Sequence, residues 1–291
     1  MGDTPTTELL ATCWTSAGDV RPGLTPDESP VAFEDRVAAV AEAGFTGIGL
    51  ELADLESVRR SRGLSSARTL IADHGLTHVE VEFLNDWWLD GDRRADSDPR
   101  RRRLLDAATA LGAHPMKLGS GQPGDDHASG RLIDELGRLG TEAREAGTRL
   151  AVETGAGSGL DLVDDVLPAV VALADPHVGL MLDPWHFVRS GTPYDVITGI
   201  AASAITAVEI SDGAATAIGS FFGDTFDRRL LPGDGAFDVS AFVSAVRGTG
   251  WTGAWGVEVM SDVLRALPVP VVLQRAFTAA TRVLGAETGS P

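Results

Sequence analysis

The sequence contains little cysteine, which forms the disulfides of secreted domains, and fewer basic than acidic residues, whereas proteins that bind nucleic acid are usually basic. Its 291 residues include a single cysteine, Cys13, which cannot form an internal disulfide. Lysine and arginine together number 24 against 42 acidic residues, and the formal net charge is −18 at pH 7. Such an excess of acids disfavours long-range attraction to a phosphate backbone or to an anionic membrane. Nucleic acids and membranes are therefore not expected as partners.

Long apolar runs are also missing. No run approaches the ~20 residues that a membrane-spanning helix needs. The polar start of the chain, residues 1–7, has neither the basic flank nor the apolar stretch of a signal peptide. No linker, low-complexity tract or shift in composition divides the chain. We therefore expect a cytoplasmic protein whose residues 1–291 form one domain, and the sequence is compatible with a homo-oligomer.

What the chain does contain is a repeated unit of a short apolar strand, a polar loop and an amphipathic helix. In the segment 99–111, for example, Pro99 suits the first turn of a helix that runs to Leu111. Strict alternation of strands and helices predicts a parallel sheet, and eight units in one domain favour a closed (β/α)₈ TIM barrel of the α/β class over an open sheet. The expected strands are residues 9–14, 46–51, 77–83, 115–119, 148–153, 178–182, 205–210 and 254–259.

The segment 178–186 shows most clearly where polar chemistry begins. Residues 178–182 include no polar side chain, as is typical of a strand buried on both faces. Pro184 cannot donate to a sheet ladder, so it ends the strand and directs Asp183 and His186 beyond the edge of the sheet. An acid that caps a turn beside a surface histidine would look the same if this segment stood alone.

The pattern recurs on the neighbouring strands. The last four expected strands each end at or near a carboxylate, namely Glu153, Asp183, Glu209 with Asp212 just beyond it, and Glu258. In a barrel these ends converge on one rim, and like charges so close repel unless protons or a cation neutralise them. Oxygen ligands suit Mn²⁺ or Mg²⁺, and a nearby imidazole makes Co²⁺ acceptable as well. The alternative is that each acid serves a local cap or salt bridge.

These motifs resemble those of a known family. In order and spacing they are similar to the xylose-isomerase-like sugar isomerase/epimerase barrels, which include ketose 3-epimerases, hydroxypyruvate isomerase, inosose dehydratase and 3-dehydroshikimate dehydratases. The resemblance spans nearly the whole chain and is strongest over residues 149–261. It is carried by Glu153 in LAVET, Asp183 and His186 in LDPWH, Glu209 and Asp212 in VEISDG, Arg229 in RLLPGDG and Glu258 in WGVEVMS.

The resemblance implies that a metal ion is ligated by Glu153, Asp183, Glu209 and Glu258. It also implies that His186 and Arg229 touch substrate oxygens. The family usually has histidine at position 209, or glutamine in some dehydratases, whereas this chain has glutamate. A carboxylate there makes the site harder and favours Mg²⁺ or Mn²⁺ over Zn²⁺. It also leaves open that Glu209 binds substrate, or that no metal is held.

A cation bound to adjacent carbonyl and hydroxyl oxygens acidifies the intervening C–H and stabilises an enediolate. We assign Glu153 and Glu258 as the acid/base pair. The sequence thus predicts a metal-dependent isomerase or epimerase of a sugar or keto-polyol, that is, of a small polyhydroxylated substrate. A dehydratase, in which a β-hydroxyl is lost, is the enzymatic alternative, and a non-catalytic sugar-binding barrel is the alternative from another class.

Further residues have two interpretations each. Trp14, Trp87 and Trp88 either stack on a substrate ring or pack in the core. Lys117, in the strand 115–119, either holds an anionic group or pairs with Glu153. Glu51 and Glu82 also stand at strand ends, where they can add polar contacts. Phosphorylated substrates are not expected, because no glycine-rich phosphate loop follows the last two strands.

Overall fold

Eight parallel strands close into a barrel in the order in which they occur along the chain. The computed structural model describes residues 7–23, 28–125 and 128–285. Every neighbouring pair is parallel, including the first and last strands, so the predicted (β/α)₈ TIM barrel is confirmed. The strands are β1 (Leu9–Ala11), β2 (Gly47–Glu51), β3 (His78–Leu84), β4 (Met116–Leu118), β5 (Leu150–Glu153), β6 (Val178–Leu182), β7 (Ile205–Ile210) and β8 (Trp255–Val257).

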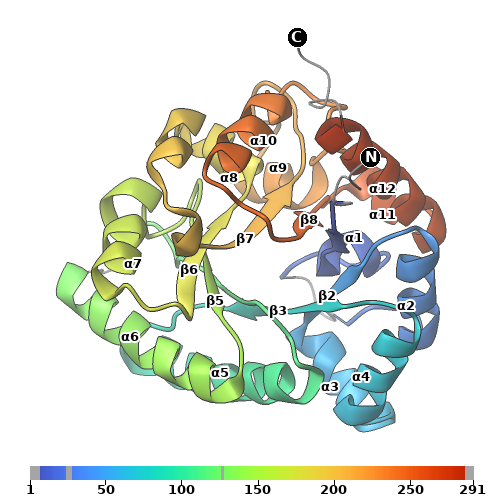
Figure 1. The fold of residues 1–291 in the computed structure, drawn as a ribbon, viewed down its shortest axis with the longest axis horizontal. Coiled ribbons are helices and arrows are strands. Elements are labelled where there is room, and N and C mark those ends of the chain that lie inside the picture. The colour runs from blue at the N-terminus through green and yellow to red at the C-terminus, as the bar shows by residue number, and fades with distance from the viewer. Residues whose placement is uncertain (1–6, 24–27, 126–127, 286–291) are drawn as a thin grey trace, which may run out of the picture.

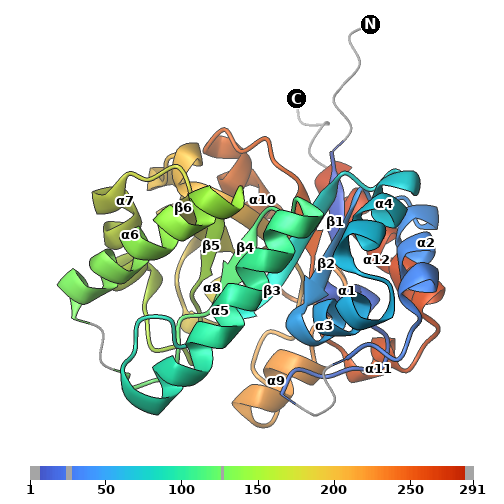
Figure 2. The same cartoon turned by 90° about the horizontal axis from the view of Figure 1, so that it is seen from below.

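Helices surround the strands on the outside (Figure 1). None of the helices in the described ranges is long and apolar enough to cross a membrane. The α-helices are α1 (Cys13–Ser16), α2 (Phe33–Glu42), α3 (Leu52–Ser61), α4 (Leu64–Asp73), α5 (Gly91–Leu111), α6 (Ser129–Ala146), α7 (Leu167–Leu173), α8 (Pro184–Ser190), α9 (Phe221–Asp227), α10 (Val239–Gly248), α11 (Asp262–Arg265) and α12 (Val269–Gly285). A π-helical turn, η1 (Leu162–Val166), precedes α7, and two 3₁₀ segments, η2 (Tyr194–Gly199) and η3 (Ala202–Ala204), precede β7. Helices α9 and α11 lie together at one end of the barrel (Figure 2).

The interior of the barrel changes from apolar to acidic along the strands. A small apolar cluster, separate from the main core, consists of Ala151, Met181 and Ala207. Side chains two residues apart in a strand share a face. The positions that follow on the same face of β5, at the end of β6 and on β7 are therefore Glu153, Asp183 and Glu209. The apolar layer thus ends where the acids begin.

Several element boundaries differ from the predicted ones, and those of β1 and α5 differ in kind. β1 ends at Ala11, and α1 begins at Cys13 inside the segment expected to be strand. Pro99 lies inside α5 instead of in its first turn, and this prediction was wrong. The preceding turns of α5 are polar, but they are held by ion pairs of Arg93 with Asp86 and Asp125, and of Arg94 with Asp98 and Glu135. These ion pairs, of which those with Asp125 and Glu135 are long-range, outweigh the one backbone donor that Pro99 lacks.

Candidate active site

The carboxylates at the ends of the last four strands lie together. One oxygen from each of Glu153, Asp183, Glu209 and Glu258 can be chosen so that all four lie within 4.8 Å of one another. Glu153 and Asp183 form a second such group with a ring nitrogen of His186. Four of the predicted strand-end acids therefore share one site with His186, whereas Asp212 does not belong to it.

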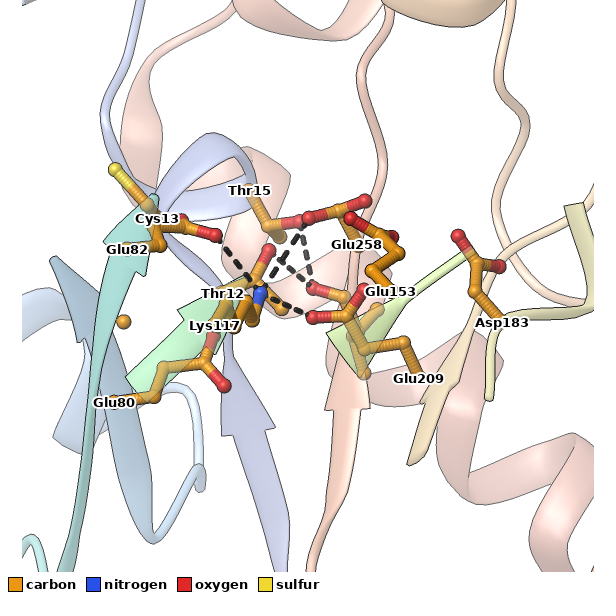
Figure 3. A network of polar contacts seen from close by, with 12 residues as sticks. Thr12, Cys13, Thr15, Glu80, Glu82, Lys117, Glu153, Asp183, Glu209 and Glu258 are labelled. Carbon is orange, nitrogen blue, oxygen red and sulfur yellow. Dashed lines mark hydrogen bonds and ion pairs between the residues drawn. The ribbon is translucent and has the colours of Figure 1, made fainter. Parts of the chain in front are cut away.

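Lys117, the only lysine in the chain, lies at one side of this cluster, next to Glu209 and Glu258. It comes from β4 and is 1% exposed. Its Nζ lies 2.9 Å from Glu82 Oε2, 3.0 Å from Glu80 Oε1 and 3.6 Å from Glu258 Oε1, and it also pairs with Glu209. Figure 3 shows the ammonium group between the acids of β3 on one side and Glu209 and Glu258 on the other. The expected partner Glu153 is not among these ion pairs, which corrects that part of the prediction.

Glycines on the neighbouring strands make room for the acids. A Cβ atom added to Gly49 of β2 would lie 2.6 Å from Glu80 Oε1. One added to Gly256 of β8 would lie 2.8 Å from Glu209 Cγ. Both distances are shorter than any relaxed contact, so a side chain at either position would displace an acid of the network. The polar interior therefore depends on the absence of side chains at these two strand positions.

Arg229 lies in the loop between β7 and β8, and it binds two of the acids. Its Nη1 lies 2.5 Å from Asp183 Oδ2 and 3.1 Å from Glu258 Oε2. Its backbone N–H donates to the carbonyl of Met260 at 3.0 Å, which fixes the residue beside the end of β8. The structure shows Arg229 fully buried and bound to the acids, and its contact with substrate oxygens, which the resemblance implied, stays a prediction.

Glu153 and His186 are the site groups that solvent reaches most easily. Both side chains are 15% exposed, and His186 Nε2 lies 3.1 Å from Glu153 Oε1 and 3.8 Å from Asp183 Oδ2. Asp183 itself is buried, and its Oδ1 accepts a hydrogen bond from the backbone N–H of Trp185 at 2.9 Å. This bond caps α8. The same residue thus ends β6 and starts the helix that carries His186.

The acids differ in proton affinity. Burial raises the pKa of Glu258 to about 7, although Arg229 and Lys117 act in the opposite direction. Burial likewise raises the pKa of Glu82 to about 7 and that of Glu209 well above its usual value. Burial disfavours the charged form of Glu153 too, but His186 beside it outweighs that effect, and the pKa of Glu153 falls to about 2.

The residues present fit a divalent cation. Six carboxylates, those of Glu80, Glu82, Glu153, Asp183, Glu209 and Glu258, surround only two permanent cations, Lys117 and Arg229, so protons, the imidazolium of His186 or a metal ion must neutralise the remaining acids. Glu209 Oε2 is buried and accepts no hydrogen bond from the described residues. Oxygens that share one Mg²⁺ or Ca²⁺ ion lie about 2.0–2.6 Å from it, hence at most about 4–5 Å apart, as the four strand-end acids do.

The tryptophans take different places. Trp87 and Trp88 belong to the hydrophobic core, and the indole N–H of Trp87 donates to the carbonyl of Gly119 at 2.7 Å, so the packing interpretation holds for both and stacking on a substrate does not. Trp14 is partly exposed and packs beside Cys13. Trp185, which the sequence analysis did not select, lies under the Arg229 guanidinium at 5.0 Å from its ring centroid. The sequence could have pointed to Trp185 through its place in the motif LDPWH, between Asp183 and His186.

Asp212 serves the loop that carries Arg229 instead of the acid cluster. It is fully buried, and its carboxylate accepts hydrogen bonds of 2.7–3.0 Å from the backbone N–H groups of Gly213, Gly233, Gly235 and Phe237. Asp212→Ala is therefore expected to lower the free energy of unfolding by at least about 3 kcal/mol, because several buried donors lose their acceptor. Urea denaturation measures the change.

The control for this variant is Asp161→Ala. Asp161 also accepts two backbone hydrogen bonds, at 2.7 and 3.0 Å, but at the exposed start of η1. Its removal is expected to cost about 1 kcal/mol, the usual value for a helix cap. Equal losses for the two variants would show that Asp212 is an ordinary cap and does not organise the loop.

The amino-acid sequence is similar to those of known proteins. A family model described as xylose isomerase-like TIM barrel matches residues 37–277. Two curated 3-dehydroshikimate dehydratases, from Pseudomonas putida and Pseudomonas aeruginosa, are 25% and 26% identical to the chain over 241 residues. These alignments cover 80% of this chain but only 37% of each relative, so the chain spans well under half of their length.

Solved structures share the fold at lower identity. IolI, crystallised with a zinc atom, superposes with a TM-score of 0.81 at 17% identity and covers 96% of this chain and 98% of its own. A D-psicose 3-epimerase, crystallised in the presence of D-fructose, gives a TM-score of 0.68 at 17% identity and covers 88% of this chain and 95% of its own. At these identities the likeness establishes the fold alone.

Proposed function

Because the chain belongs to the family of xylose isomerase-like TIM barrels, we propose that it is a metal-dependent isomerase or epimerase of a small polyhydroxylated carbonyl compound. The observation that carries this proposal is the meeting of four carboxylates, from the ends of β5 to β8, within 4.8 Å. The chain is similar in sequence to a dehydratase and in structure to an epimerase, and both of these proteins are enzymes, which supports a catalytic role.

The proposed metal ligands are Glu153, Asp183, Glu209 and Glu258, with Mn²⁺ or Mg²⁺ as the preferred ion because all four donors are oxygens. A cation there polarises a carbonyl and its neighbouring hydroxyl, which acidifies the C–H bond between them. Co²⁺ and Zn²⁺ are the competing ions, since His186 offers a nitrogen donor and IolI was crystallised with zinc.

Side chains of the protein itself remove and return the proton of the substrate. Glu153 is the most exposed of the four strand-end acids, so a substrate that enters from solvent meets it together with His186. We assign removal of the carbon-bound proton to Glu153, with Glu258 as the group that returns a proton from the other side. Lys117 and Arg229, both buried and ion-paired, hold the acids in position.

A dehydratase is the second candidate, and the two curated relatives favour it. The same base would remove a proton, and a β-hydroxyl would then leave as water. The two reactions share their first step, so the acid cluster supports them equally. Products distinguish them, because only dehydration creates a conjugated double bond that absorbs in the ultraviolet.

The experiment is a screen of ketoses, inososes and 3-dehydroshikimate in D₂O, with the metal-loaded protein. Deuterium in recovered sugar, without new ultraviolet absorbance, would support isomerisation or epimerisation. New absorbance without label in recovered substrate would support the dehydratase. If no substrate exchanges or reacts while sugars still bind, the protein is a sugar-binding barrel and the proposed catalysis is wrong.

Metal binding can be followed without any substrate. Since Lys117 is the only lysine, protein labelled with [ε-¹³C]lysine has one such lysine signal, located within the acid cluster. After chelation, added Mn²⁺ is expected to broaden this signal at one equivalent, because the paramagnetic ion binds beside the ammonium group. Asp183→Asn is the matched variant and should require more Mn²⁺. Broadening that is equal in both proteins, or absent, would contradict the assigned ligands.

A further inference from the structure

A cavity of about 340 Å³ lies at the end of the barrel opposite the acid cluster. Its lining comes from the starts of the strands: His78 and Ile205 are the first residues of β3 and β7, while Pro115 and Ala254 immediately precede β4 and β8. Its volume is at the lower end of the range of about 300–1,000 Å³ that is usual for small-molecule sites. The strand-end acids of the candidate active site lie at the other ends of these strands, and Glu80, which pairs with Lys117, is the member of the acid network that also lines the cavity.

Two residues that line the cavity carry buried polar atoms without partners. Thr206 is 6% exposed, and its Oγ1 has no hydrogen-bond partner among the described residues. The same holds for the indole Nε1 of Trp251. A Cβ atom at Gly179 would lie 2.3 Å from Thr206 Oγ1, so only a glycine there leaves room for the hydroxyl. Buried donors in native proteins nearly always have an acceptor, which indicates that a guest supplies one here.

The charged groups at this cavity are mainly basic. Arg149, His78 and His114 line it, and among the described residues no carboxylate lies within ion-pair distance of Arg149. The Arg149 guanidinium donates only to carbonyls, those of Pro176 at 2.7 Å and Ser203 at 3.4 Å. Partial burial lowers the pKa of His114, and the nearby positive charge of Arg149 lowers it further.

The acids near the cavity already have partners. Glu80, the carboxylate in the lining, lies 3.0 Å from Lys117. Glu8 lies 2.9 Å from His78. The positive charge of Arg149 therefore has no carboxylate partner among the described residues at this end of the barrel, although the chain as a whole carries a net charge of −18. A guanidinium without a carboxylate, beside unpartnered hydroxyl and indole donors, is the donor set that an oxyanion requires.

We propose that this cavity binds a small oxyanion, either a carboxylate or a phosphate, with Arg149 as its charge partner and Thr206 and Trp251 as hydrogen-bond donors. This inference does not depend on the proposed function, because none of these residues belongs to the acid cluster.

Calorimetric titrations of the full chain with sodium phosphate and with sodium malate test the proposal, against sodium chloride at equal ionic strength. Saturable binding of either probe, but not of chloride, is expected. Binding of phosphate alone identifies a phosphate site, and binding of malate alone identifies a carboxylate site. Absence of saturable binding by both probes would overturn the proposal.

Variants locate the binding. Arg149→Met is expected to weaken binding at least about tenfold, since it removes a charge-assisted contact. Arg144→Met is the matched control, because it makes the same charge change at an exposed residue of α6 and should bind as the unmodified protein does. Equal affinity in the two variants would show that the ion binds elsewhere.

Thr206→Val guards against a folding defect in the arginine variant. The hydroxyl of Thr206 has no partner in the part of the chain that the structure describes, so valine should leave the unfolding midpoint unchanged or raise it. Its affinity for the probe should nevertheless fall severalfold. Unchanged affinity in Thr206→Val, with the fold intact, would contradict the assigned position of the anion.

Discussion

Lys117→Met is expected to lower the free energy of unfolding by about 3–5 kcal/mol, the usual consequence of removing one partner from a buried ion pair. The ammonium group contacts Glu80, Glu82, Glu209 and Glu258, and all four acids are buried. Methionine replaces the four-carbon stem of the lysine but not its ammonium group, so these carboxylates lose their shared cation. Urea denaturation of the metal-free proteins at neutral pH measures the loss.

The cause of this loss can be separated from a packing defect. Adding Glu209→Gln to Lys117→Met removes one of the acids that the ammonium group pairs with. The double variant should therefore recover part of the free energy of unfolding that Lys117→Met loses. Arg59→Met is the surface control: Arg59 lies 3.8 Å from Glu56 on α3, and its loss should cost less than about 1 kcal/mol. If the double variant is less stable than Lys117→Met, charge imbalance is not the reason for the loss.

The location of the site could be predicted because it depends on chain topology. Once eight alternating units indicate a barrel, the ends of consecutive strands must meet, and Glu153, Asp183 and Glu258 are found by that rule alone. The alternation in β5 and β6 also leads from the small apolar layer to the acids two residues later. Neither step requires knowledge of a side-chain contact.

The partners of these acids could not be predicted in the same way. The sequence predicts a strand at residues 77–83, but the alternation of its side chains does not say which face is inside. In this barrel the polar face, with Glu80 and Glu82, points inward and meets Lys117 from the adjacent strand. Which of several interior acids the lysine contacts depends on side-chain length and on the space left by Gly49 and Gly256.

Loop acids were the least predictable. Asp212 follows Glu209 by three residues and was grouped with the strand-end acids, yet its carboxylate binds backbone N–H groups of residues 213–237. Pro99 was misplaced for a related reason, because the ion pairs that extend α5 toward Gly91 join residues far apart in sequence. Propensity and spacing carry no information about such partners.

Glu153→Gln is expected to reduce turnover of the substrate found in the screen by about 10²–10⁴-fold, the range for loss of a general base. The amide keeps an oxygen that can bind a cation, but it cannot accept a proton from carbon. Wash-in of deuterium from D₂O should fall in parallel with turnover, because both need the same proton transfer. The metal content of the variant, measured alongside, shows whether the ion is retained.

The matched control is Glu51→Gln, which replaces another acid at the end of a strand. Glu51 pairs with Arg100 and accepts a hydrogen bond from Ala53 at the start of α3, outside the acid cluster. Its turnover should stay within about threefold of the unmodified protein, since its contacts with Arg100 and Ala53 do not involve the acid cluster. If Glu153→Gln keeps its metal and still exchanges deuterium at the original rate, Glu153 is not the base. The exchange rate of Glu258→Gln then decides whether the acid of β8 removes the proton instead, because the two glutamates are the only members of the proposed pair.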